Sequence, residues 1–130
     1  NNMILGGAIQ PVSFIEILDK IEELDTTIKA AIKNINKYTI AEYISVIAKI
    51  HYELTILHPF NDGNGRTIRA LTNWLLRLKG LCPIYIDSNN RDEYLKALRK
   101  IDEENNYELL EIVIIKSIIR TMAELHKSWQ

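Results

Sequence analysis

Apolar residues recur at steps of three and four along most of the chain, which is the spacing of helices that bury one face. The first such stretch follows Ser13 and Glu16, whose spacing is that of a capping box, and it predicts a helix from about 13 to 24. Asp25 is placed to cap a second helix. The apolar positions of this second helix are Ile28, Ala31, Ile32 and Ile35.

A third and longer apolar stripe begins after Thr39 and Glu42, another pair with the spacing of a capping box. Its apolar positions are Ile40, Tyr43, Ile44, Ile47, Ile50, Leu54 and Leu57. Because the helical spacing is kept over the whole stretch, it predicts one helix that ends just before His58.

The second half of the chain shows the same periodicity. A fourth helix is expected to begin near Asn64 or Gly65 and to run to Gly80, a residue type that favours the helix C-cap. Turn-forming residues at 87–90 can cap a further helix from 91 to about 104.

The last periodic stretch runs from about Tyr107 to Lys127. It is apolar nearly all round between Leu109 and Ile119, and a helix of that kind is normally buried. Together the stretches predict an all-α fold, a compact bundle of about six helices.

A length of 130 residues suits one domain with a real core and is too short for two. Residues 1–12 have no helical period and contain Gly6, Gly7 and Pro11, so they read as a loop or a short extended piece. The helical domain is therefore expected to span 13–130.

The charge balance gives no global attraction to polyanions. Sixteen basic and seventeen acidic residues leave a net charge of −1, so neither nucleic acid nor a membrane surface is an expected partner. Cys82 is the one cysteine and cannot form an internal disulfide, and no apolar run is long enough to span a bilayer. These features predict a cytoplasmic protein.

The densest chemistry lies in residues 58–69, which read His-Pro-Phe-Asn-Asp-Gly-Asn-Gly-Arg-Thr-Ile-Arg. A helix N-terminus leaves backbone N–H groups unpaired and carries positive partial charge, and it therefore binds phosphate. The adjoining turn supplies Gly63, Asn64 and Gly65, where two glycines let the backbone turn tightly and a ligand approach closely. We therefore expect an anion cradle at the start of the fourth helix.

Arg66 and Arg69 lie three residues apart, on one face of that helix's first turn. Cations at a helix N-terminus oppose the helix dipole, so two arginines there need negative charge to neutralise them. Anionic oxygens of a ligand would provide it, and salt bridges to acidic side chains are the structural alternative.

His58 and Asp62 complete the stretch. An imidazole at the end of one helix and beside the cradle can take a proton from an incoming hydroxyl, which makes His58 the candidate general base. A single carboxylate suits Mg²⁺, which completes its octahedron with water and substrate phosphates, and N-capping is the alternative role for Asp62. His51 and His126 are interpreted as structural or surface residues.

The same stretch resembles the signature of the Fic family, His-x-Phe-x-(Asp/Glu)-Gly-Asn-Gly-Arg-x-x-Arg. Every specified position is matched, by His58, Phe60, Asp62, Gly63, Asn64, Gly65, Arg66 and Arg69. The resemblance implies a helical Fic domain that transfers AMP from ATP to a Tyr, Thr or Ser hydroxyl of a target protein, with release of pyrophosphate.

The resemblance also implies a role for each matched position. His58 would be the general base and Asp62 the Mg²⁺ ligand. The anion hole around the α and β phosphates would be formed by Gly63, Asn64 and Gly65. Arg66 and Arg69 would hold the β and γ phosphates.

Two looser features extend the resemblance. Residues 6–11 are similar to the end of the flap that in Fic proteins holds the target segment by strand addition. Tyr94 resembles an aromatic position near the adenine and ribose, so it is a candidate adenosine contact. A core tyrosine on one apolar face with Leu95 and Leu98 is an equal alternative.

Many Fic proteins carry an inhibitory motif, (Ser/Thr)-x-x-x-Glu-(Gly/Asn). In this sequence only Glu104 is followed by Gly or Asn, and Lys100 stands four residues before it, so the motif is absent. A separate antitoxin-like inhibitor, an inhibitor in a preceding segment, or an unrestrained enzyme are the alternatives. Two other functions are also retained: UMP or phosphocholine transfer, and a nucleotide-responsive binding module or toxin component without turnover.

Overall fold

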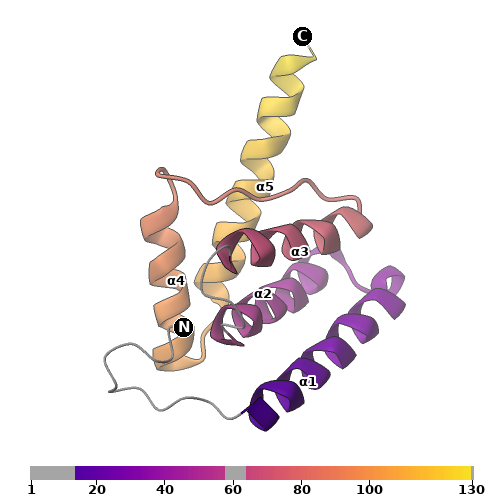
Figure 1. Ribbon diagram of the computed structural model, residues 1–130. Helices are drawn as coiled ribbons and strands as arrows, with labels where there is room; N and C mark the ends of the chain where they lie inside the picture. Colours follow the sequence, from indigo (N-terminus) through magenta and orange to yellow (C-terminus); the bar gives the residue numbers. More distant parts are fainter. Residues whose placement is uncertain (1–13, 58–63, 130) are drawn as a thin grey trace.

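The computed structural model describes residues 14–129 except for 58–63, and this part of the chain is helical without any strand. Its elements are α1 (Phe14–Lys33), the 3₁₀ turn η2 (Ile35–Lys37), α2 (Ile40–Leu57), α3 (Asn64–Leu78), α4 (Arg91–Glu104) and α5 (Glu108–Ser128). The predicted all-α class is confirmed, with five α-helices in the described residues in place of about six (Figure 1).

The count differs because α1 is one continuous helix where the sequence predicted two. Asp25 does not cap a second helix but lies inside α1, where it pairs with Lys29 one turn later at 2.9 Å. Thr26 and Thr27 donate their hydroxyls to carbonyls one turn back, at 3.0 Å each. Since no Gly or Pro interrupts this segment, these residues are accommodated without a break.

Helix α2 begins at the predicted capping box. The Thr39 N–H donates to Glu42 Oε1 at 2.8 Å, and the Glu42 N–H donates to Thr39 Oγ1 at 3.1 Å. From there α2 packs against α1, α3 and α5, and its side chains Tyr43, Ile47 and Ile50 are fully buried. This helix is therefore the centre of the core (Figure 1).

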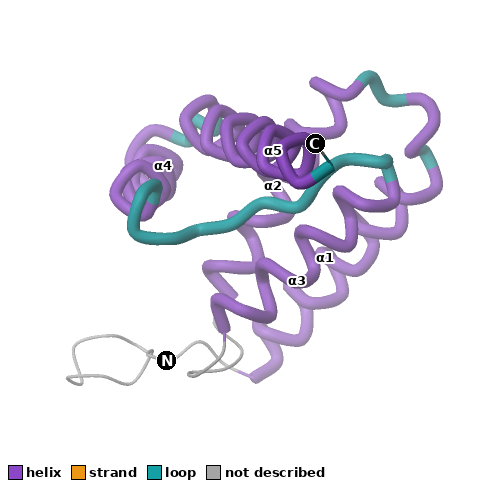
Figure 2. The backbone as a smooth tube through the Cα atoms, turned by 90° about the horizontal axis from the view of Figure 1, so that it is seen from above, coloured by secondary structure: helices purple, strands orange, loops and turns teal. Residues whose placement is uncertain are grey.

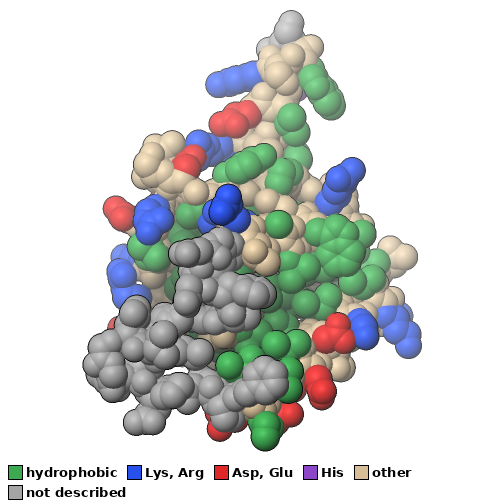
Figure 3. All heavy atoms as spheres, in the orientation of Figure 1, with side chains coloured by type: hydrophobic (Ala, Val, Ile, Leu, Met, Phe, Trp, Pro, Cys, Tyr) green, Lys and Arg blue, Asp and Glu red, His purple; other side chains and the backbone are tan. Residues whose placement is uncertain are grey.

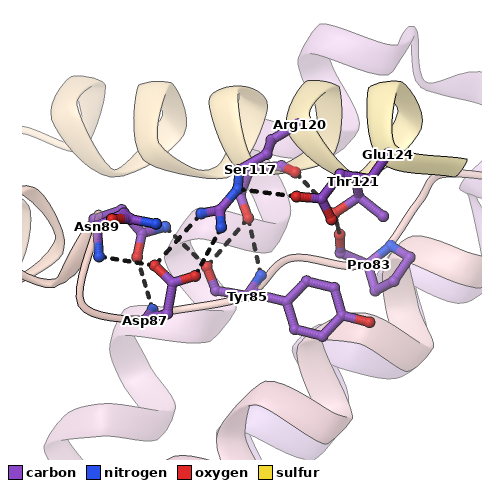
Figure 4. Close-up of polar contacts among 9 residues, drawn as sticks. Pro83, Tyr85, Asp87, Asn89, Ser117, Arg120, Thr121 and Glu124 are labelled. Carbon is purple, nitrogen blue, oxygen red and sulfur yellow. Dashed lines mark hydrogen bonds and ion pairs between the residues drawn. The ribbon is translucent and has the colours of Figure 1, made fainter. Parts of the chain in front are cut away.

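An extended connection leads from α3 to α4. It starts at Gly80, whose positive φ of 80° confirms the predicted C-cap, and it passes alongside α5 (Figure 2). Ser117 of α5 fixes the connection by accepting the Tyr85 N–H at 2.9 Å and donating to the Tyr85 carbonyl at 3.2 Å. Thr121 donates to the Pro83 carbonyl at 3.0 Å (Figure 4).

Helix α4 has the predicted bounds but not a side-chain cap. The Asn90 amide is used by the preceding turn, where it accepts the Asp87 N–H at 2.9 Å and donates to the Tyr85 carbonyl at 2.8 Å. The Arg91 N–H instead donates to the Asp87 carbonyl. The turn residues thus order the chain before the helix, and the backbone closes its first turn.

Helix α5 is buried on one face only, which corrects the expectation that it is buried all round. Leu110, Val113, Ile114 and Ile118 lie in the core. By contrast Ile112, Ile115 and Ile119 are exposed, because they lie on the face of α5 that is turned away from the core. The last turns of α5 project beyond the bundle (Figure 1). Hydrophobic side chains are exposed both on the helical bundle and on the projecting end of α5 (Figure 3).

Within residues 14–57 and 64–129, no helix combines the length and the apolar character that a membrane span requires.

Candidate active site

The predicted site straddles the boundary of the described structure. His58, Asp62 and Gly63 lie outside the described residues, as does the predicted flap segment in residues 1–12, and their roles stay predictions. The described part holds Asn64, Gly65, Arg66, Arg69 and Tyr94. Four of these five lie in the first two turns of α3 and one lies in α4.

The start of α3 has the position that the sequence predicted. Helix α2 ends at Leu57 and α3 begins at Asn64, so residues 58–63 connect two helices that pack against each other. The first turn of α3 contains no acidic residue. Its unpaired N–H groups and positive dipole end are therefore not offset by a carboxylate of that turn.

Arg66 and Arg69 add two positive charges to this helix end. Arg66 is exposed and Arg69 is half-buried. Within the described part of the chain, neither guanidinium forms a salt bridge, whereas Arg120 pairs with two carboxylates. Two cations without a carboxylate partner at the positive end of a helix form a region that favours an anion.

Gly65 provides room for one of these cations. A Cβ atom at Gly65 would lie only 3.0 Å from Nη1 of Arg69, so the guanidinium rests against the backbone of the first turn. Any larger residue would displace it. The glycine thus allows Arg69 to fold back toward the N-terminus of its own helix.

A buried polar network lies near Arg69. The imidazole of His51, from α2, is fully buried and contacts Thr72 Oγ1 through Nδ1 at 2.8 Å. Its Nε2 contacts the hydroxyl of Tyr94 at 2.7 Å. Burial, and then the charge of Arg69, lower the pKa of His51 from 6.5 to about 4, so the ring is neutral at pH 7.

Tyr94 lies on the face of α4 that packs against the core. Its ring meets that of His51 edge to face, with centroids 5.6 Å apart. Burial raises the pKa of Tyr94 to about 12, so its hydroxyl keeps its proton. The described structure therefore has Tyr94 partly in the core with its hydroxyl bonded to His51, while its contact with adenosine stays a prediction.

Sequence reasoning left His51 as a structural or a surface residue and did not find its partners. His51 continues the buried stripe of α2, four residues after Ile47, and this spacing does predict burial. Nothing in the sequence pairs it with Thr72 and Tyr94, which lie 21 and 43 residues further along the chain.

No metal site can be assembled from the described residues alone, since no three His, Cys, Asp or Glu side chains are grouped there. The Mg²⁺ prediction rests on Asp62, outside the described residues. A single carboxylate beside a phosphate-binding helix end fits Mg²⁺, which takes few protein ligands and keeps water and phosphate oxygens.

Comparisons with known proteins address the resemblance. The family model described as "Fic/DOC family" matches residues 9–76, which include the whole signature, all of α2 and all but the last two residues of α3. No solved structure gave a significant match to the chain.

Relatives with assigned names are similar over a shorter stretch. "Protein adenylyltransferase Fic" of Aedes aegypti is 42% identical over 60 residues, which are 46% of this chain and 12% of that protein. The protein of the same name in Culex quinquefasciatus is 45% identical over 56 residues, 43% of this chain and 11% of that protein. The matches thus cover only a small part of these relatives' length.

The family match covers more than half of the chain and includes the start of α3 described above. The chain belongs to the Fic/DOC family.

Proposed function

We propose that this protein is a protein adenylyltransferase, which moves AMP from ATP to a Tyr, Thr or Ser hydroxyl of a target protein. The observation that carries the proposal is the first two turns of α3, where Arg66 and Arg69 lie near the positive end of a helix without a carboxylate partner among the described residues. The names of the similar insect proteins support the same reaction class.

The phosphates occupy the start of α3 in this proposal. Backbone N–H groups at Gly63, Asn64 and Gly65 surround the α and β phosphates. Arg66 and Arg69 neutralise the β and γ phosphates with their guanidinium groups. Catalysis of phosphoryl transfer depends mainly on such positioning and charge neutralisation.

The chemical step is an in-line displacement at the α phosphorus. The oxygen of the target hydroxyl forms a new bond to that phosphorus, and the bond to the bridging oxygen of the β phosphate breaks. His58 accepts the hydroxyl proton, and pyrophosphate leaves with the electrons of the broken bond. Asp62 would hold a Mg²⁺ ion, which supplies charge neutralisation for the phosphate oxygens.

The test is a His58→Ala variant, assayed with Mg²⁺ and α-labelled ATP in a cell lysate, where labelled protein bands report transfer. The variant should bind ATP with nearly unchanged affinity, because the phosphate contacts lie elsewhere, and it should transfer no label. Normal transfer by the variant would overturn the assignment of His58. Failure of the wild-type chain to label any protein, itself included, would overturn the function.

A further inference from the structure

Three side chains from three helices form one continuous chain of hydrogen bonds beside Arg69. Tyr94 comes from α4, His51 from α2 and Thr72 from α3. Thr72 then bonds to the carbonyl of Ile68 at 2.8 Å, and Ile68 directly precedes Arg69. The chain therefore joins the core to the helical turn that carries the arginine.

The bond from Thr72 to the Ile68 carbonyl favours one direction for the chain, and we assign that direction here. With its hydroxyl proton on the Ile68 carbonyl, Thr72 Oγ1 is an acceptor for His51. His51 is buried and neutral, so the proton that it donates is on Nδ1 and its Nε2 is an acceptor. Nε2 receives the hydroxyl proton of Tyr94.

Arg69 precedes Thr72 by three residues on α3, so the two side chains lie on one face of that helix, and the charge of Arg69 acts on both rings. It lowers the pKa of His51 and, against the larger effect of burial, that of Tyr94. Both ring nitrogens of His51 are already occupied, one as donor and one as acceptor. The imidazole thus offers the guanidinium neither a free acceptor nor a repelling charge.

We propose that the Tyr94–His51–Thr72 chain is a positioning device for Arg69, which keeps the guanidinium over the first turn of α3 and available to the nucleotide's terminal phosphates. Without the Tyr94 hydroxyl, His51 Nε2 would be an unpaired buried acceptor close to a cation, and it would compete with the phosphates for Arg69. Without the Thr72 hydroxyl, the Nδ1 proton would lose its acceptor and the ring would no longer be held in one tautomer. The proposal rests on the proposed ATP-dependent function.

The experiment removes single hydroxyls in matched pairs. Tyr94→Phe is compared with Tyr43→Phe, because the Tyr43 hydroxyl is also buried and donates to the Leu75 carbonyl at 2.6 Å. Thr72→Val is compared with Thr121→Val, because Thr121 makes the same bond to the carbonyl one turn back but lies in α5. Thr72→Ser restores the hydroxyl and serves as the conservative rescue.

The readouts are the dissociation constants of Mg²⁺-ATP and of AMP, with circular dichroism and thermal unfolding to confirm that each variant folds. Tyr94→Phe and Thr72→Val should weaken ATP binding on the order of tenfold, because a displaced guanidinium loses its phosphate contact. AMP binding should not change, because AMP has no β or γ phosphate. Tyr43→Phe, Thr121→Val and Thr72→Ser should keep wild-type affinity even where they lower the unfolding temperature.

Three results would overturn the proposal. Equal losses for ATP and AMP in Tyr94→Phe would mean that the hydroxyl contacts adenosine directly. Unchanged ATP binding in both Tyr94→Phe and Thr72→Val would mean that the network is structural only. Equal losses in the matched control variants would mean that lowered stability, and not the position of Arg69, weakens binding.

A second measurement separates this proposal from the proposed function. The ¹⁵N relaxation of the Arg69 Nε–H group reports its order without any nucleotide. Its order parameter should fall in Tyr94→Phe and Thr72→Val and stay at the wild-type value in Tyr43→Phe and Thr121→Val. An unchanged order parameter in the first two variants would overturn the positioning role even if AMP transfer were demonstrated. If AMP transfer failed, a lowered order parameter in these variants would still support the positioning role.

Discussion

Arginines occupy two contrasting places in this molecule: the first turns of α3 and the corner where the 81–90 connection meets α5. At the corner, Arg120 donates to both oxygens of Asp87, at 2.9 and 3.4 Å, and its Nε lies 3.5 Å from Glu124 (Figure 4). At the start of α3, Arg66 and Arg69 have no such partner among the described residues. Charge at the corner is thus paired within the protein, whereas Arg66 and Arg69 have no carboxylate partner in residues 14–57 and 64–129, and we propose that a ligand provides one.

The two places also use a buried threonine differently. Thr121 and Thr72 each donate to the carbonyl one turn back in their helix. Thr121 additionally bonds to the backbone of Pro83, which fixes the connection, while Thr72 accepts from the imidazole of His51. The threonine at the corner thus bonds to backbone carbonyls only. The threonine near the start of α3 also bonds to a side chain, and a single substitution can remove that bond.

The largest expected difference is between Arg69→Ala and Arg120→Ala. Removing Arg69 should lower kcat/KM for AMP transfer on the order of 100-fold, as loss of a group that neutralises transition-state charge does. Its unfolding temperature should stay the same or rise, because a cation at a helix N-terminus is unfavourable. Arg120→Ala should retain activity and lose a little stability, because its ion pairs are exposed.

Kinetics with ATP and thermal unfolding of both variants measure this contrast. If Arg69→Ala were as active as the wild type, or if Arg120→Ala lost activity while still folded, the division of roles between the two places would be wrong.

The next effect is a difference in the pH range over which each place loses its contribution to the free energy of unfolding. The folded pKa of His51 is about 4 against 6.5 for an exposed histidine, so the unfolded chain binds more protons between these values. Stability from His51 is therefore complete above pH 6.5 and decreases as the pH falls toward 4, by up to roughly 3 kcal/mol. Arg120 lowers the pKa of Asp87 below 3.8, so the corner's contribution is lost only at more acidic pH.

Urea unfolding between pH 7 and pH 4.5 measures the first of these ranges. A His51→Gln variant is the control, because it lacks the titrating ring and should lose less stability over this interval. Identical pH profiles of the two proteins would contradict the neutral buried state of His51.

The smallest expected effects come from replacing two glycines by alanine, and the two replacements should change stability in opposite directions. Gly65→Ala should leave stability unchanged or raise it by up to about 1 kcal/mol through helix propensity, but the new methyl displaces Arg69 and should raise KM for ATP several-fold. Gly80→Ala meets no neighbouring atom but must adopt a φ of 80°, which costs about 1 kcal/mol. Its KM should not change.

Chemical unfolding and steady-state kinetics of the two alanine variants give both quantities. If the two variants lost equal stability and equal activity, Gly65 would serve only the backbone, as Gly80 does. The argument that Gly65 makes room for Arg69 would then be wrong.

Local signals in the sequence determined most of the fold. The capping box at Thr39 and Glu42 and the glycine at 80 mark helix ends through contacts within one turn, and the structure has them where predicted. The prediction that Asp25 begins a second helix was wrong, because a good capping residue is also tolerated inside a helix when a lysine follows one turn later. The exposed side of α5 was missed because a helix that is apolar nearly all round does not show in its sequence which face packs against a neighbour.

The sequence predicts an anion cradle at the start of α3, which stays a prediction, but it does not predict the buried side chains beside it. The glycines and arginines of residues 63–69 indicate an anion site by their types and spacing alone. The bonds of His51 to Thr72 and Tyr94 depend on how α2, α3 and α4 pack, and such tertiary pairing leaves no periodic trace in one sequence.

The central claim, AMP transfer, is tested most directly by incubating the wild-type chain and Mg²⁺ with α-labelled and γ-labelled ATP in parallel. AMP transfer predicts that protein becomes labelled from the α phosphate and never from the γ phosphate, with release of labelled pyrophosphate in the second incubation. Protein labelled from γ-labelled ATP and not from α-labelled ATP would contradict it.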